Sequence, residues 1–138
     1  MKIASFIAVS ALALSINVQA ADDHKGHTHD AKGAEHAHEV KPQHGGVVSV
    51  VKDVNYELVT SADAIALYVS DHGKPSDLTG GSAKLTLLSG SKKTEAALSP
   101  ENGALRAQGA FNVSAGTKVV AQVTLKGQAA QAVRFTIK

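Results

Sequence analysis

After residue 42 the chain is a succession of short segments rich in β-branched residues, several of which alternate apolar with polar side chains. The segments are residues 47–51, 56–60, 64–70, 83–89, 94–98, 104–110, 118–125 and 130–137. Turn clusters rich in Gly, Asn, Asp, Ser and Pro separate them, and no stretch has a helical period. This pattern predicts an all-β fold, a small immunoglobulin-like antiparallel β-sandwich of seven or eight strands. The alternative is a smaller barrel of the OB type.

The composition limits how such a domain is stabilised. The chain has no cysteine, which excludes a disulfide framework, a disulfide-linked partner, thiolate metal sites and cysteine nucleophiles. The roughly 95 residues after Pro42 suffice for one small domain, so we assign residues 43–138 to a single sandwich. Alanine is frequent at the strand positions, and we expect a thin core of modest stability.

The N-terminus has the features of a secretory signal peptide. Lys2 precedes an apolar stretch, residues 3–18, that is too short and too rich in alanine to span a bilayer convincingly. A small-residue cleavage motif ends at Ala20. We predict that residues 1–20 are removed and that the protein is periplasmic, with no membrane span. Cleavage after Ala21 is the alternative.

Between the predicted signal peptide and the sandwich lies a polar, histidine-rich tract, residues 21–42. It contains five of the seven histidines of the chain, namely His24, His27, His29, His36 and His38. Carboxylates are interspersed among them, and apolar side chains are almost absent, so we expect the tract to be disordered without metal. Imidazoles at this spacing suit a divalent Zn, Ni, Co or Cu(II) ion, whereas the soft ligands that favour Cu(I) are missing. The tract is therefore predicted to be a metal-binding tail.

The position of cleavage affects the first histidine of this tail. If cleavage follows Ala21, the free amine, two backbone amides and His24 could form a square-planar nitrogen set. Such a set suits Cu(II) and Ni(II). If cleavage follows Ala20, which we favour, this arrangement is not available.

Three motifs follow one another after Pro42: H-G-G at residues 44–46, Y-E-L at residues 56–58 and D-H-G-K-P at residues 71–75. Together they resemble a module of the periplasmic adaptor subunits of heavy-metal efflux pumps of the resistance-nodulation-division type, and small stand-alone periplasmic proteins related to it. The family pattern has proline directly before the histidine, where this chain has Gln43. The resemblance implies divalent heavy-metal handling beside an efflux adaptor or pump. The chain lacks the long helical hairpin and lipoyl-like segments of complete adaptors.

The folded part also offers metal-ligand candidates, namely His44, Glu57, Asp63, Asp71 and His72. A simple meander with turns near residues 53–54 and 62–63 predicts His44 opposite Asp63, Val50 opposite Glu57, and Glu57 opposite Tyr68. On this register His44 and His72 lie at opposite ends of the sheet, about 20 Å apart at about 3.3 Å per residue. We therefore expect two half-sites, His44 with Asp63, and Asp71 with His72.

Structural explanations compete with these assignments. The glycines after His44 suit a flexible entry into the first strand. Asp71, His72 and the glycine after them suit an ordinary hairpin turn. Glu57 faces solvent if Leu58 faces the core, which is the default for an alternating strand.

Three function classes are compatible with the sequence. The leading one is a periplasmic accessory protein that binds divalent heavy metals and buffers or delivers them to an efflux system. The second is a non-catalytic interaction module that docks on an efflux adaptor or pump, with the tail as a passive tether. An enzyme is the weakest, because only two histidines lie in the folded part and no nucleophile-elbow motif is present. The nearly balanced charge argues against a nucleic-acid partner.

Overall fold

The structure, a computed structural model, describes residues 40–138. The described part is all-β, and no helix that could cross a membrane occurs within it. Its nine strands are β1 (Val47–Val51), β2 (Val54–Thr60), β3 (Ala64–Asp71), β4 (Lys74–Pro75), β5 (Ser82–Ser89), β6 (Lys92–Glu101), β7 (Ala104–Gln108), β8 (Lys118–Thr124) and β9 (Gln131–Thr136). Eight of these correspond to the eight predicted segments. The two-residue β4 lies in a region predicted to be a turn.

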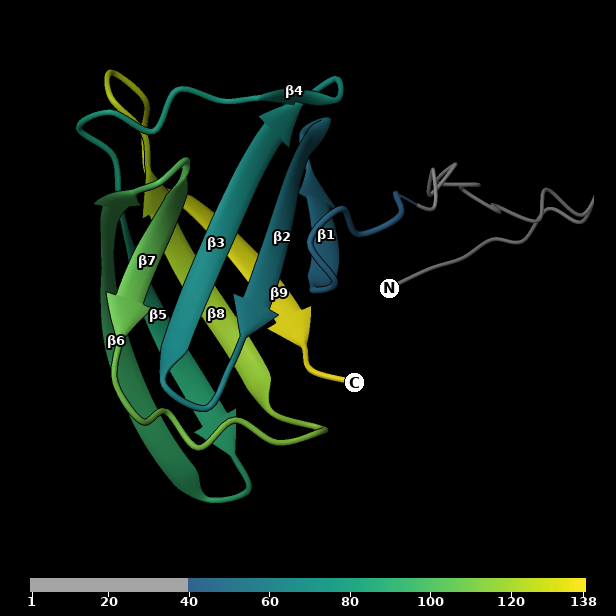
Figure 1. Cartoon of the computed structure of the whole chain (residues 1–138), viewed down its shortest axis with the longest axis vertical. Coiled ribbons are helices and arrows are strands. Elements are labelled where there is room, and N and C mark those ends of the chain that lie inside the picture. Colours follow the sequence, from purple (N-terminus) through teal and green to yellow (C-terminus); the bar gives the residue numbers. More distant parts are fainter. Residues whose placement is uncertain (1–39) are drawn as a thin grey trace, which may run out of the picture. The chain divides into compact units, whose positions relative to one another are not determined.

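The strands form two packed layers with immunoglobulin-like topology (Figure 1). Paired neighbours follow the order β1-β2-β3-β7-β6-β5-β8-β9, every pair is antiparallel, and β4 pairs with β3. From β2 onward this order is the A-B-E-D-C-F-G order of an immunoglobulin sandwich, preceded by one extra strand. The predicted fold class is therefore confirmed, and the OB-type alternative is excluded.

One long strand connects the two layers. The first residues of β6, Lys92 to Leu98, pair with β5, and the last three, Ser99 to Glu101, pair with β7. At the other side the end strands β1 and β9 contact each other but have no pairing register. We call the layer of β1, β2, β3 and β7 the front sheet, and the layer of β5, β8, β9 and the first part of β6 the back sheet (Figure 1).

The core lies between the front and back sheets. Alternate residues of each strand point inward, so that the front sheet contributes Leu58 and Leu67 and the back sheet contributes Leu85. Three strand alanines, Ala83, Ala96 and Ala121, belong to the same cluster. Alanine does fill core positions, as the sequence suggested, so the apolar area that each such position buries is small.

Two short hairpin turns set the register of the front sheet. Val51 pairs with Val54, so the β1–β2 turn consists of Lys52 and Asp53, and both have positive φ, as a type I′ turn requires. The predicted turn was one residue too late. Since such an error shifts the pairing by two, the predicted pair of Val50 with Glu57 is wrong, and Val48 lies opposite Glu57 instead. The predicted pairing of Glu57 with Tyr68 is confirmed.

Candidate functional site

A buried carboxylate lies on the outward face of the front sheet, at the middle of β2. Glu57 is only 6% exposed, although its neighbours Tyr56 and Leu58 occupy the core. Three backbone amides donate to its carboxylate: Gln43 N to Oε2 at 2.9 Å, His44 N to Oε1 at 2.7 Å, and Gly46 N to Oε1 at 3.0 Å. The expectation that an outward Glu57 faces solvent is therefore wrong, because the segment before β1 folds over it.

Two glycines let this segment reach the carboxylate. Gly45 has φ +77, a left-handed conformation that glycine adopts without strain. A Cβ on Gly46 would lie 2.3 Å from the carbonyl oxygen of Leu58, so only glycine fits this close approach to β2. The H-G-G motif is thus a shaped loop and not a merely flexible entry into the first strand. We call residues 43–46 the capping loop.

The fourth hydrogen bond to the carboxylate comes from the imidazole of His44, whose Nδ1 lies 2.9 Å from Glu57 Oε2. Burial by itself raises the pKa of Glu57, but the hydrogen bonds from Gly46, His44 and Gln43 outweigh it, and the pKa is lowered from 4.5. Glu57 is therefore ionised at neutral pH and can only accept hydrogen bonds. It follows that Nδ1 of His44 carries a proton, and that the lone pair of the neutral ring lies on Nε2.

The His44 ring is also held from its face. It stacks on the ring of Tyr68, with a centroid distance of 3.6 Å and an interplanar angle of 3°. Tyr68 lies directly opposite Glu57 on β3, and its hydroxyl accepts a hydrogen bond of 3.0 Å from Arg106 on β7. Ala66 pairs with Arg106, so the arginine is the diagonal neighbour of Tyr68 on the same face. Three adjacent strands and the capping loop therefore fix one imidazole.

This arrangement prepares His44 to bind an electrophile through Nε2. In protein metal sites a ligating histidine almost always donates its other ring N–H to a carboxylate, a carbonyl or water, which fixes the ring and raises its basicity. The His44 side chain is 40% exposed, and Nε2 has no hydrogen-bond partner within residues 40–138. A complete site needs further ligands, since no group of three or more His, Cys, Asp or Glu side chains suited to a metal occurs in the described part.

The second predicted half-site is an exposed hairpin turn. His72 and Gly73, both with positive φ, are the two central residues between the paired Asp71 and Lys74. Nδ1 of His72 is hydrogen-bonded to Oδ1 of Asp71, and both side chains are largely exposed. The D-H-G-K-P motif thus has a turn-forming role, and its histidine is held by one carboxylate in solvent.

The predicted residues are therefore only partly brought together. His24, His27, His29, His36 and His38, with the predicted signal peptide and most of the tail, lie outside the described residues. The pairing of His44 with Asp63 is wrong, because His44 bonds Glu57, and Asp63 accepts instead from Ser61 in the β2–β3 turn.

Sequence reasoning missed Tyr68 and Arg106 as parts of the candidate site. A signal for Tyr68 existed, because the predicted register already placed it opposite Glu57, where side chains of facing strands touch. Arg106 had no such signal, since its proximity depends on the pairing of β3 with β7, which are far apart in the chain.

The comparisons with known proteins give no relative. No family model, no curated protein and no solved structure matches this chain.

Proposed function

We propose that the protein is a non-catalytic, periplasmic metal-binding accessory protein that buffers divalent heavy-metal ions or delivers them to an efflux system. The observation that carries the proposal is the hydrogen bond from His44 Nδ1 to the ionised Glu57, which leaves Nε2 as the ligand atom. A fixed imidazole loses less entropy on binding than a free one, so it is a favourable first ligand. The ions it suits are Zn, Ni, Co and Cu(II).

In this proposal the histidine-rich tract of the same chain supplies metal ligands of its own. Its five histidines and interspersed carboxylates precede His44 by at most twenty residues in sequence. Ligands of mixed nitrogen and oxygen type on such a tract favour weak binding of several ions, which suits buffering or transfer. The resemblance of the three motifs to efflux adaptor modules supports delivery to an efflux adaptor or pump.

Titration calorimetry of the purified protein with Zn(II), Ni(II) and Cu(II) tests the proposal. We expect more than one ion per chain. In a variant with alanine at His24, His27, His29, His36 and His38, we expect most of this capacity to be lost, with an unchanged β-sheet circular dichroism spectrum. The same stoichiometry in this variant would exclude the tract as the metal carrier.

The role of His44 has a matched control in the same chain. His44→Ala is expected to weaken the tightest site about tenfold, since one ligand is lost. His72→Ala removes an imidazole that is also bonded to a carboxylate, but on an exposed turn, and is expected to leave that affinity within about twofold. Equal effects of the two substitutions would contradict the assignment of His44.

A further inference from the structure

The outward face of the back sheet carries the excess positive charge of the domain. Its strands β6, β5, β8 and β9 present Lys93, Lys84, Lys118 and Arg134 outward, with Glu95 as the one carboxylate of this face. Residues 42–138 contain ten basic and seven acidic side chains. The six bases and six acids outside this face cancel each other, so the net charge of +3 belongs to the face alone.

The pairing register shows how these side chains lie. Leu88 on β5 is opposite Lys93 on one side and Lys118 on the other, and Val120 on β8 is opposite Arg134. Thr86, Leu88 and Val120 line a shallow groove together with Lys93, Lys118 and Arg134. The floor of the groove is thus largely apolar and its edges are cationic.

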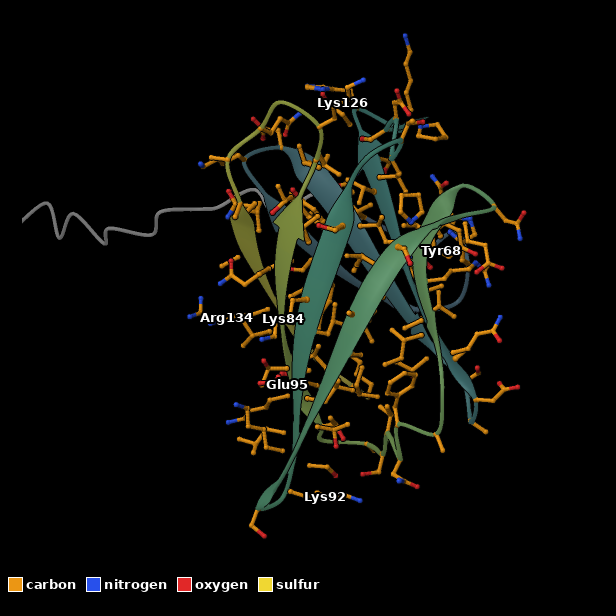
Figure 2. All side chains as sticks on the ribbon, turned by 90° about the vertical axis from the view of Figure 1, so that its left-hand side faces the viewer. Tyr68, Lys84, Lys92, Glu95, Lys126 and Arg134 are labelled. Carbon is orange, nitrogen blue, oxygen red and sulfur yellow. The ribbon has the colours of Figure 1, made fainter. Side chains whose placement is uncertain are left out.

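The only carboxylate of the face does not neutralise the groove. Glu95 Oε1 lies 3.0 Å from the ammonium of Lys93, and Oε2 lies 3.5 Å from that of Lys84. Lys118 and Arg134 have no ion-pair partner within residues 40–138. Figure 2 shows Lys84, Glu95 and Arg134 on one side of the domain and Tyr68 on the other, so this face is separate from the candidate metal site.

We propose that the outward face of the back sheet is a docking surface for an acidic segment of a partner protein. Charge complementarity selects the occupant, because carboxylates of an extended segment can reach Lys118 and Arg134, which face solvent without partners among the described residues. Leu88 is 44% exposed at the floor and accepts an apolar side chain of that segment. The apolar floor favours a protein segment over a nucleic acid. A nucleic acid binds through its phosphates or by stacking its bases on aromatic rings, and neither contact uses an exposed aliphatic side chain such as Leu88.

Fluorescence polarisation with a labelled acidic peptide tests this inference on the purified protein. The probe is Glu-Glu-Leu-Glu-Glu-Leu-Glu-Glu, and its binding is measured at about 20 mM and at about 300 mM NaCl. Exposed charges are well screened at the higher concentration. We expect saturable binding at low salt that weakens about tenfold at high salt. The double variant Lys118→Glu, Arg134→Glu is expected to lose at least tenfold in affinity, whereas Leu88→Ser loses a few-fold.

A matched variant separates this face from the overall charge. Lys52→Glu, Lys126→Glu changes the net charge equally at positions off the face, and its peptide affinity should remain within about twofold of wild type. Equal losses in the two double variants, or no saturable binding of the peptide, would overturn the docking surface. A labelled single-stranded oligonucleotide of the same charge that binds more tightly, with no effect of Leu88→Ser, would overturn the protein partner. None of these results depends on metal binding.

Discussion

Two glutamates, one on each face of the sandwich and each at an outward position of a strand, differ greatly in their burial. Glu57 on the front sheet is 6% exposed and binds three backbone amides and an imidazole. The Glu95 side chain on the back sheet is 46% exposed and pairs with two lysines in solvent. The capping loop covers Glu57, whereas no loop of the described residues is hydrogen-bonded to the Glu95 carboxylate. An alternating strand therefore fixes which way a side chain points, and a third element decides whether it is buried.

The largest expected effect is the loss of the Glu57 carboxylate. Glu57→Ala leaves three partly buried amides and the His44 N–H without their acceptor, and we expect it to lower the free energy of unfolding by about 3 kcal/mol. Urea unfolding followed by far-UV circular dichroism measures this, since the chain has no tryptophan. Glu95→Ala is the matched control and should produce no measurable change. If the two substitutions lowered the free energy of unfolding by similar amounts, the hydrogen bonds from the capping loop to Glu57 would not be stabilising.

A smaller effect is expected from the glycine that touches β2. Gly46→Ala forces the capping loop away from the Leu58 carbonyl, and should lower the free energy of unfolding by about 2 kcal/mol. Gly45→Ala introduces only the strain of a left-handed backbone, because no atom lies within 4 Å of the added Cβ, and should cost about 1 kcal/mol. The same urea experiment compares the two variants. If Gly45→Ala were the more damaging, the close approach at Gly46 would not be what holds the loop.

The smallest expected effect is the pH dependence of that free energy. The pKa of Glu57 is lowered in the folded protein, so its contribution is fully present well above 4.5, its ordinary value, and is lost as pH falls through the lower folded pKa. Below about pH 4.5, wild-type stability should therefore fall more steeply than that of Glu57→Gln. The lowered pKa values of Asp77 and Glu95 act in both proteins and cancel in the difference. If the free energies of unfolding of the two proteins fell equally with pH, the four hydrogen bonds would not stabilise the ionised form of Glu57.

The strand pattern and the registers of local hairpins could be predicted from the sequence with small errors. The pairing of Glu57 with Tyr68 was correct because a short turn at residues 61–63 fixes it, whereas the β1–β2 register was missed by one turn position. That error came from Lys52 and Asp53, which occupy left-handed conformations that more often belong to glycine or asparagine.

The candidate site was predicted less well than the fold. His44 and Glu57 were both selected from the sequence, but they were assigned to different environments. Their contact needs the chain to reverse at Gly45 and approach β2 at Gly46, and alternation along a strand contains no information about such a covering loop.

By itself, the sequence determined the antiparallel β-sandwich fold, because alternating β-branched segments and turn residues are local signals. The histidine-rich tract and the three motifs are likewise recognised from the sequence alone. Only the tertiary structure decided that Glu57 is buried, that Tyr68 on β3 stacks on the His44 ring while Arg106 on β7 bonds the Tyr68 hydroxyl, and that three bases line the groove at Leu88. These contacts join segments distant in sequence, so they depend on strand order and on loop closure, which arise only when the whole domain packs.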